Sequence, residues 1–66
     1  MKIEIVSRIN ADGYIINGKF YYCNEIDKIK DLIGNEPVSF IKGRNTFAGE
    51  EVSDDFFYSM IERLGY

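Results

Sequence analysis

The residues of this sequence that are able to do chemistry are mostly acidic, and four of them fall in one short stretch. Glu50, Glu51, Asp54 and Asp55 lie within six residues of one another. Carboxylate oxygens at that density are ligands of the kind that Mg²⁺ and Ca²⁺ prefer. The spacing of a calcium-binding loop is missing, however, and Ser53 is typical of a helix start directly before the two aspartates. We therefore expect the aspartates to complement the positive end of a helix and the glutamates to be solvated, with no metal bound.

Histidine is absent and cysteine occurs once, as Cys23. Without histidine the chain lacks the commonest general base, the usual catalytic triad and most zinc sites. A single thiol cannot form a thiolate zinc site, and Cys23 has no histidine to activate it, so we expect it to pack. The stretch Gly43–Gly49 lacks the Gly-Lys-Ser/Thr ending of a phosphate loop. These observations predict a protein that is not an enzyme and that needs no cofactor.

Length and charge limit the classes of protein that remain. The chain has 66 residues and a formal net charge of −3. This length predicts one domain over residues 1–66 with a small core, since a chain of about 60 residues buries only about 60% of its surface on folding. The acidic balance argues against duplex DNA as a partner. One cysteine, no signal-peptide pattern and no apolar run of transmembrane length predict a cytoplasmic protein that does not bind membranes.

Hydrophobic periodicity and turn residues indicate four strands and two helices. The strands are predicted at residues 2–9, 14–16, 19–23 and 38–42, and the helices at residues 24–34 and 53–65. Asn24 and Ser53 are the expected N-caps, and Gly34 is the expected stop of the first helix. Because short hairpins join the first three strands, we expect an α+β fold in the order βββαβα. It should hold a small, mainly antiparallel four-stranded sheet and two helices, in two layers.

The two hairpin turns decide which residues share a face of the sheet. Asn17-Gly18 is a strong hairpin signal and pairs Tyr14 with Tyr21. Residues 10–13 favour a three-residue loop closed by a left-handed Gly13. The predicted core face then holds Ile3, Ile5, Ile9, Ile15, Phe20 and Tyr22, and the opposite, exposed face holds Val6, Tyr14, Ile16 and Tyr21. A loop of different length would exchange the two faces, and a helix over the second face is a further alternative.

The leading hypothesis is a non-enzymatic protein-binding module, a small inhibitor or regulator that occupies the surface of a partner protein. Tyrosine suits such an interface because it supplies large contact area at low entropic cost. If the partner binds nucleic acid, the acidic stretch could compete with phosphates. Phe47, in the connection over residues 43–52, is either a binding tip or a lid on the core. The residues expected to contact the partner are Tyr14, Ile16, Tyr21, Phe47, Glu50, Glu51, Asp54 and Asp55.

Small inhibitors encoded by phages and mobile elements, anti-CRISPR proteins among them, are commonly of this size and make-up, although the sequence contains none of their motifs. A second hypothesis is a nucleic-acid-binding accessory domain, in which bases stack on Tyr14 and Tyr21. It requires the available cations, Lys2, Arg8, Lys19, Lys42 and Arg44, to converge on one face of the sheet. A third is a homodimer formed through the tyrosine face or an edge strand.

Overall fold

Five strands and two helices make up residues 1–66, all of which the computed structural model describes. In chain order they are β1 (Lys2–Arg8), β2 (Ala11–Ile16), β3 (Lys19–Tyr22), α1 (Ile26–Ile33), β4 (Ser39–Asn45), β5 (Glu50–Glu51) and α2 (Asp54–Arg63). The α+β class and the two helices are confirmed. The prediction of four strands is wrong, because β4 continues past Lys42 and the chain turns back to pair a fifth strand with its end.

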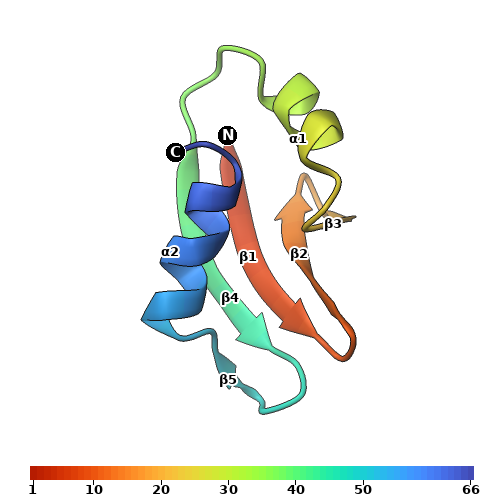
Figure 1. Ribbon diagram of the computed structural model, residues 1–66, viewed down its shortest axis with the longest axis vertical. Coiled ribbons are helices and arrows are strands. Elements are labelled where there is room, and N and C mark those ends of the chain that lie inside the picture. Colours follow the sequence, from red (N-terminus) through yellow and green to blue (C-terminus); the bar gives the residue numbers. More distant parts are fainter.

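The sheet is mixed, with the strand order β3-β2-β1-β4-β5. Three neighbouring pairs are antiparallel, but β4 lies parallel to β1 in the middle of the sheet (Figure 1). The chain reaches that position through α1, the kind of long crossover that a parallel pair needs. Gly43 and Arg44 stand together opposite Val6, since the partner of Ile5 is Lys42 and the partner of Ser7 is Asn45. This bulge keeps Gly43 inside a strand, where the sequence predicted a loop.

The first hairpin turn differs from the predicted one, and the difference exchanges the two faces of the sheet. Arg8 pairs with Ala11, so the loop consists of Ile9 and Asn10 alone, and Asn10 takes the left-handed conformation at φ 62°. Gly13 lies inside β2 instead of closing the loop. The second hairpin is as predicted, with Asn17 at φ 52° and Gly18 at φ 79°.

The core lies on the face that carries Ile3 and Ile5 of β1, and both helices cover that face. Ile5 pairs with Tyr14 and Ile3 pairs with Ile16, so these two β2 residues point into the core, where they are 0% and 1% exposed. The predicted exposure of Tyr14 and Ile16 is therefore wrong. The predicted burial of Ile9 is wrong as well, since that side chain is 65% exposed. The remaining core side chains come from the helices and the segment before α2: Ile29, Ile33, Val52, Met60 and Leu64.

Tyr14 joins the sheet to α2 through a hydrogen bond as well as by packing. Its hydroxyl donates to the Met60 carbonyl at 2.6 Å. Helix α2 ends here, and the Leu64 N–H bonds to the Ile61 carbonyl instead of continuing to Met60. The phenol therefore satisfies a carbonyl that the end of the helix leaves free. Burial raises the pKa of Tyr14 to about 12, so the hydroxyl keeps its proton at all ordinary pH values.

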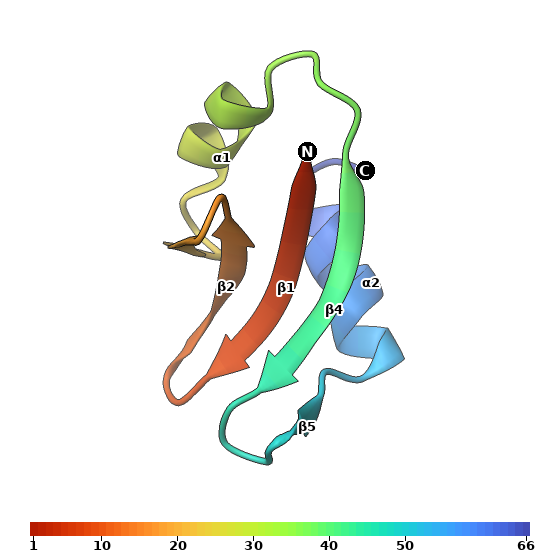
Figure 2. The same cartoon turned by 180° about the vertical axis from the view of Figure 1, so that it is seen from behind.

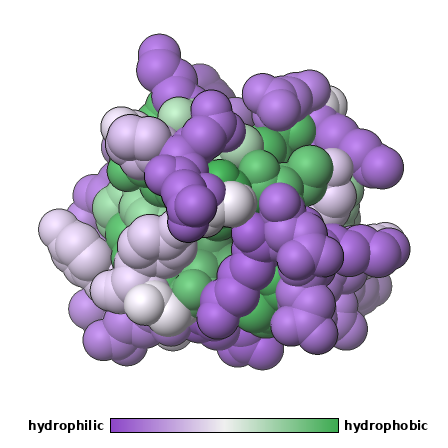
Figure 3. Space-filling model, turned by 90° about the horizontal axis from the view of Figure 1, so that it is seen from above, coloured by the Kyte–Doolittle hydropathy of each residue, from purple (hydrophilic) through white to green (hydrophobic).

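The helix ends follow the sequence signals with one exception. The Ser53 hydroxyl accepts the Phe56 N–H at 3.2 Å, which confirms Ser53 as the N-cap of α2. Gly34 ends α1 at φ 55°, as expected. Helix α1 has Glu25 at its N-cap position instead of Asn24, and no side chain caps it. Seen from the end of the molecule where the N-terminus and α1 lie, apolar surface gathers between hydrophilic side chains (Figure 3).

Candidate functional site

The opposite face of the sheet is covered by neither helix (Figure 2). We call it the open face, and the strand register assigns to it Lys2, Glu4, Val6, Arg8, Ala11, Gly13, Ile15, Phe20, Tyr22, Ser39, Ile41 and Gly43. Most of its central residues are apolar. Tyr22 and Ile41 remain 54% and 41% exposed, although both belong to strands of the sheet. An apolar face of this kind on a small domain is a candidate interaction surface.

Two glycines make room for side chains of the open face. A Cβ atom on Gly13 would lie 2.6 Å from Cζ of Phe20, so the phenyl ring lies over the glycine backbone. A Cβ atom on Gly43 would lie 2.6 Å from Cγ1 of Val6, which rests on the second glycine in the same way. Gly13 is therefore required for space and not for a left-handed turn. Both glycines are buried beneath side chains of the open face.

Arg8 and Tyr22 hold the Phe20 ring in place on this surface. The Arg8 guanidinium lies 4.1 Å from the centroid of the Phe20 ring, a cation–π contact. The Tyr22 ring meets Phe20 edge to face, with centroids 5.1 Å apart. These contacts fix the aromatic side chains before any partner binds. Sequence reasoning placed Phe20 and Tyr22 in the core, so it missed both of these surface residues.

The free edge of the sheet at β3 is partly closed by Glu25. The backbone groups of Phe20 and Tyr22 point away from β2, because Lys19 and Tyr21 form the hydrogen-bonded pairs of the hairpin. The Tyr22 N–H donates to the Glu25 carboxylate and the Tyr22 carbonyl accepts the Glu25 N–H, each at 3.0 Å. The Tyr22 N–H, and then Lys28, lowers the pKa of Glu25. Only the Phe20 backbone is left for strand addition, which makes the open face a better contact site than this edge.

Phe47 and Ile9 project from two neighbouring loops at one end of the sheet. They are 79% and 65% exposed, more than any other large apolar side chain of the chain. The loop of Phe47 is tied to β1, because the Thr46 N–H donates to the Ser7 carbonyl at 2.8 Å. The Asn45 side chain accepts the N–H groups of Phe47 and Ala48, at 3.0 and 3.2 Å. The alternative in which Phe47 folds back onto the core is therefore wrong.

Tyr21 lies on the helix side of the sheet and not on the face predicted for it. It packs against the core, and Lys19 Nζ lies 5.4 Å from the centroid of its ring. Together with Lys28, Asp31 and Leu32, these two residues line a hollow of about 400 Å³ between β3 and α1. Tyr21 is thus half-buried and separated from the open face by the sheet.

The acidic residues lie around the start of α2. Glu50 and Glu51 form the short edge strand β5, and Asp54 and Asp55 occupy the first turn of the helix. Asp54 forms an ion pair with Lys42, and this hydrogen bond raises the pKa of the lysine. Nowhere in the chain do three or more histidine, cysteine or acidic side chains gather in a way that could hold a metal ion.

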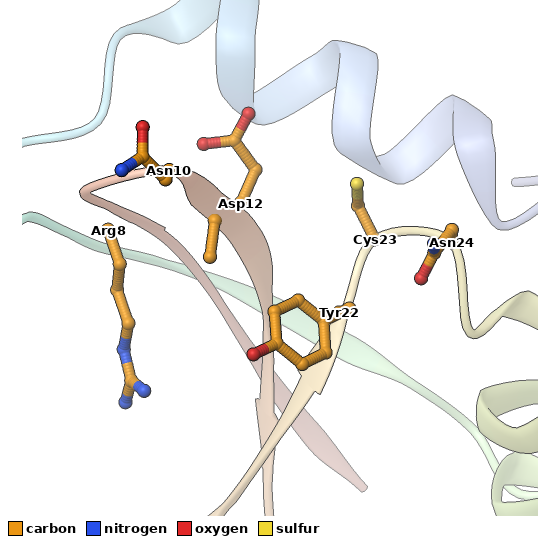
Figure 4. A pocket seen from close by; sticks show the side chains of 7 residues that line it. Arg8, Asn10, Asp12, Tyr22, Cys23 and Asn24 are labelled. Atoms are coloured by element: carbon orange, nitrogen blue, oxygen red, sulfur yellow. The ribbon is translucent and has the colours of Figure 1, made fainter.

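A shallow hollow of about 500 Å³ lies where the β1–β2 turn meets the end of β3. In Figure 4, Arg8 and Tyr22 point to one side of the strands and Asp12 and Cys23 to the other, so the hollow wraps around a corner of the sheet. It contains a thiol, a carboxylate and a guanidinium but no histidine. The arrangement brings together no nucleophile and activating base, and it extends the open face.

No family model, no curated protein and no solved structure matches the chain. None of its helices has the length and apolar character needed to cross a membrane.

Proposed function

We propose that the chain is a non-enzymatic protein-binding module, an inhibitor or regulator that acts by covering part of a partner protein with its open face. The observation that carries the proposal is that both helices pack on one face of the sheet, which leaves apolar and aromatic side chains uncovered on the other. Tyr22 and Ile41 are the exposed members of that surface. Proteins as small as this one rarely leave such a face bare without a use for it.

The preorganised aromatic side chains support the proposal. Phe20 is held between the Gly13 backbone and the Arg8 guanidinium, and Tyr22 is braced against its edge. A side chain that is already fixed loses little rotamer entropy when a partner binds. Aromatic and arginine residues are also the types most often found to dominate binding energy at protein interfaces.

The proposed contact surface also includes Phe47 at one end of the sheet and the acidic residues around the start of α2. Phe47 is displayed on a loop whose backbone is hydrogen-bonded internally, so it too would bind at low entropic cost. Glu50, Glu51 and Asp55 form no ion pair within the chain. A partner with a basic, nucleic-acid-binding surface beside an apolar patch would complement both features. Inhibitors that phages and mobile elements direct against such proteins are the class we favour.

The alternative of direct nucleic-acid binding has less support. Of the available cations, Lys19 and Lys42 lie on the helix side, the first over Tyr21 and the second paired with Asp54. The cations therefore do not converge on one face. Arg8 already covers one side of the Phe20 ring, so a base could stack there only by displacing the guanidinium.

Capture of partners from the organism that encodes the chain tests the proposal. The tagged protein is compared with a Tyr22→Ala/Ile41→Ala variant by quantitative mass spectrometry. We expect the partner to be depleted about tenfold or more, since two truncated anchor residues each cost on the order of 1 kcal/mol or more. The matched control is Leu32→Ala/Tyr58→Ala, which removes side chains that are 42% and 63% exposed on the two helices.

Equal recovery of all proteins with the open-face variant and with the control would contradict the proposal, provided that circular dichroism shows both variants folded. Loss of a partner with the helix variant alone would place the contact surface on the helices instead. Binding of the purified protein to a labelled single-stranded oligonucleotide, with affinity that falls steeply as salt rises, would favour the nucleic-acid alternative.

A further inference from the structure

The open face carries three charged side chains that form no ion pair within the chain, namely Lys2, Glu4 and Arg8. The ion pairs of the protein are Lys28–Glu25 and Lys42–Asp54, and neither Glu4 nor Arg8 takes part in one. Glu4 and Arg8 stand four residues apart on β1, which in a strand is a separation of about 13 Å between their Cα atoms. They are therefore too far apart to pair with each other. Both charges are therefore free to pair with a group outside the chain.

Glu4 and Arg8 are placed symmetrically about Val6, which lies midway between them on the same face. Consider two copies packed sheet against sheet, with a twofold axis that passes over Val6, lies between the sheets and is perpendicular to β1. This axis places Glu4 of each copy opposite Arg8 of the other, so two such pairs form. An axis parallel to β1 would instead place Glu4 on Glu4 and Arg8 on Arg8. Charge complementarity thus selects one of the two ways in which the face can pack against itself.

The shape of the open face suits the same packing. Phe20 and Val6 occupy the space left free by Gly13 and Gly43. Two such faces could pack at the spacing of about 10 Å that packed sheets adopt. The perpendicular axis also brings Tyr22 close to Tyr22 of the second copy, because both lie in the row of Val6 across the sheet. The Arg8 guanidinium lies over the Phe20 ring and forms no ion pair within the chain, so its N–H groups are free to donate to a carboxylate.

We propose that a second copy of this chain occupies the open face, sheet against sheet, in a symmetric dimer held by reciprocal Glu4–Arg8 pairs. The inference rests on the proposed function, because it names the occupant of that same face in the free protein. The dimer and a complex with another protein are then mutually exclusive. Self-association keeps the apolar surface out of water until a partner displaces the second copy.

Charge reversal followed by sedimentation analysis over a range of concentrations tests this dimer. The wild type is expected to dimerise. Glu4→Arg and Arg8→Glu should each weaken the dimer about tenfold or more, because like charges then face each other at two places. An equimolar mixture of the two variants should restore it, since both facing pairs in the mixed dimer are then opposite in sign. Glu62→Arg and Lys30→Glu, matched reversals at exposed positions on the helices, should leave the wild-type dimer unchanged.

A wild type that stays monomeric up to about 1 mM, where association is worth only about 4 kcal/mol, would overturn the inference. So would single variants that dimerise like the wild type, or a mixture that stays monomeric although both variants are folded. A monomeric wild type that still captures a partner through Tyr22 and Ile41 would leave the proposed function standing alone. A wild-type dimer with the predicted charge dependence and no captured partner would support the dimer and contradict the proposed function.

Discussion

Replacing Tyr14 by phenylalanine is expected to lower the free energy of unfolding by about 1 to 3 kcal/mol, because the buried Met60 carbonyl loses its hydrogen-bond donor. A domain of this size has a total stability of only roughly 3 to 5 kcal/mol, so the loss is a large fraction of it. Tyr14→Ala also removes the ring from the core, at a cost of about 3 to 5 kcal/mol, and should leave the chain unfolded. Urea denaturation followed by circular dichroism measures both effects.

Tyr21→Phe is the matched control, since Tyr21 faces Tyr14 across the hairpin and its hydroxyl makes no hydrogen bond. It should change the stability by less than about 0.5 kcal/mol. The pH profile separates the hydroxyl from the ring. Because burial raises the pKa of Tyr14 from 10.0 to about 12, its contribution is complete below pH 10 and is lost as the pH rises through about 12. Tyr14→Phe should lack this alkaline loss, and an unchanged stability in that variant would contradict the described contact.

Replacing Gly13 by alanine should also destabilise the fold, by about 1 to 3 kcal/mol, although alanine is normally better than glycine in a strand. The added Cβ atom would lie 2.2 Å from the Tyr21 carbonyl oxygen and 2.6 Å from the Phe20 ring. The ring can swing away, but the carbonyl belongs to the backbone of β3, so the hairpin itself must shift. The midpoint of urea denaturation is expected to fall accordingly.

Two further variants show which contact is responsible. Ser39→Ala changes a small exposed residue on β4 and should alter the stability by no more than about 0.5 kcal/mol. If the backbone contact dominates, removing the ring in a Gly13→Ala/Phe20→Ala double variant will not recover the stability of Phe20→Ala alone. Full recovery would mean that only the ring resists the added methyl group, and the same stability for Gly13→Ala as for the wild type would show that the glycine is not required for space.

Local signals in the sequence were sufficient for the elements that depend on neighbouring residues alone. Asn17-Gly18 forms the predicted hairpin, Ser53 caps α2, and Gly34 ends α1. The fifth strand and the parallel pairing of β4 with β1 could not be predicted in this way. The parallel pairing depends on contacts between residues more than thirty positions apart, such as Ile3 with Phe40, for which a single sequence carries no signal. The fifth strand has only two residues, Glu50 and Glu51, too few to show a strand periodicity.

The sequence predicts the wrong residues on the open face of the sheet, and the role of Gly13 explains the error. A glycine is required either where the backbone is left-handed or where a side chain has no room. The sequence does not distinguish these two reasons. The sequence prediction places Gly13 in a left-handed turn, which makes the first hairpin loop three residues long. In the structure Gly13 is required because a side chain has no room there. The apolar face with an exposed tyrosine was therefore correct in kind, but it consists of Phe20 and Tyr22 in place of Tyr14 and Tyr21.

The account depends on the short turn at Ile9 and Asn10, which places Tyr14 inside and leaves Tyr22 outside. Chemical nitration of tyrosine, located by peptide mass spectrometry, measures this directly. The Glu4→Arg variant is used at low concentration, so that no second copy shields the open face. Tyr22, Tyr58 and Tyr66, which are 54%, 63% and 58% exposed, should react, and Tyr14 should be protected as long as the chain is folded. Rapid nitration of Tyr14 together with protection of Tyr22 would contradict the register, and with it the open face.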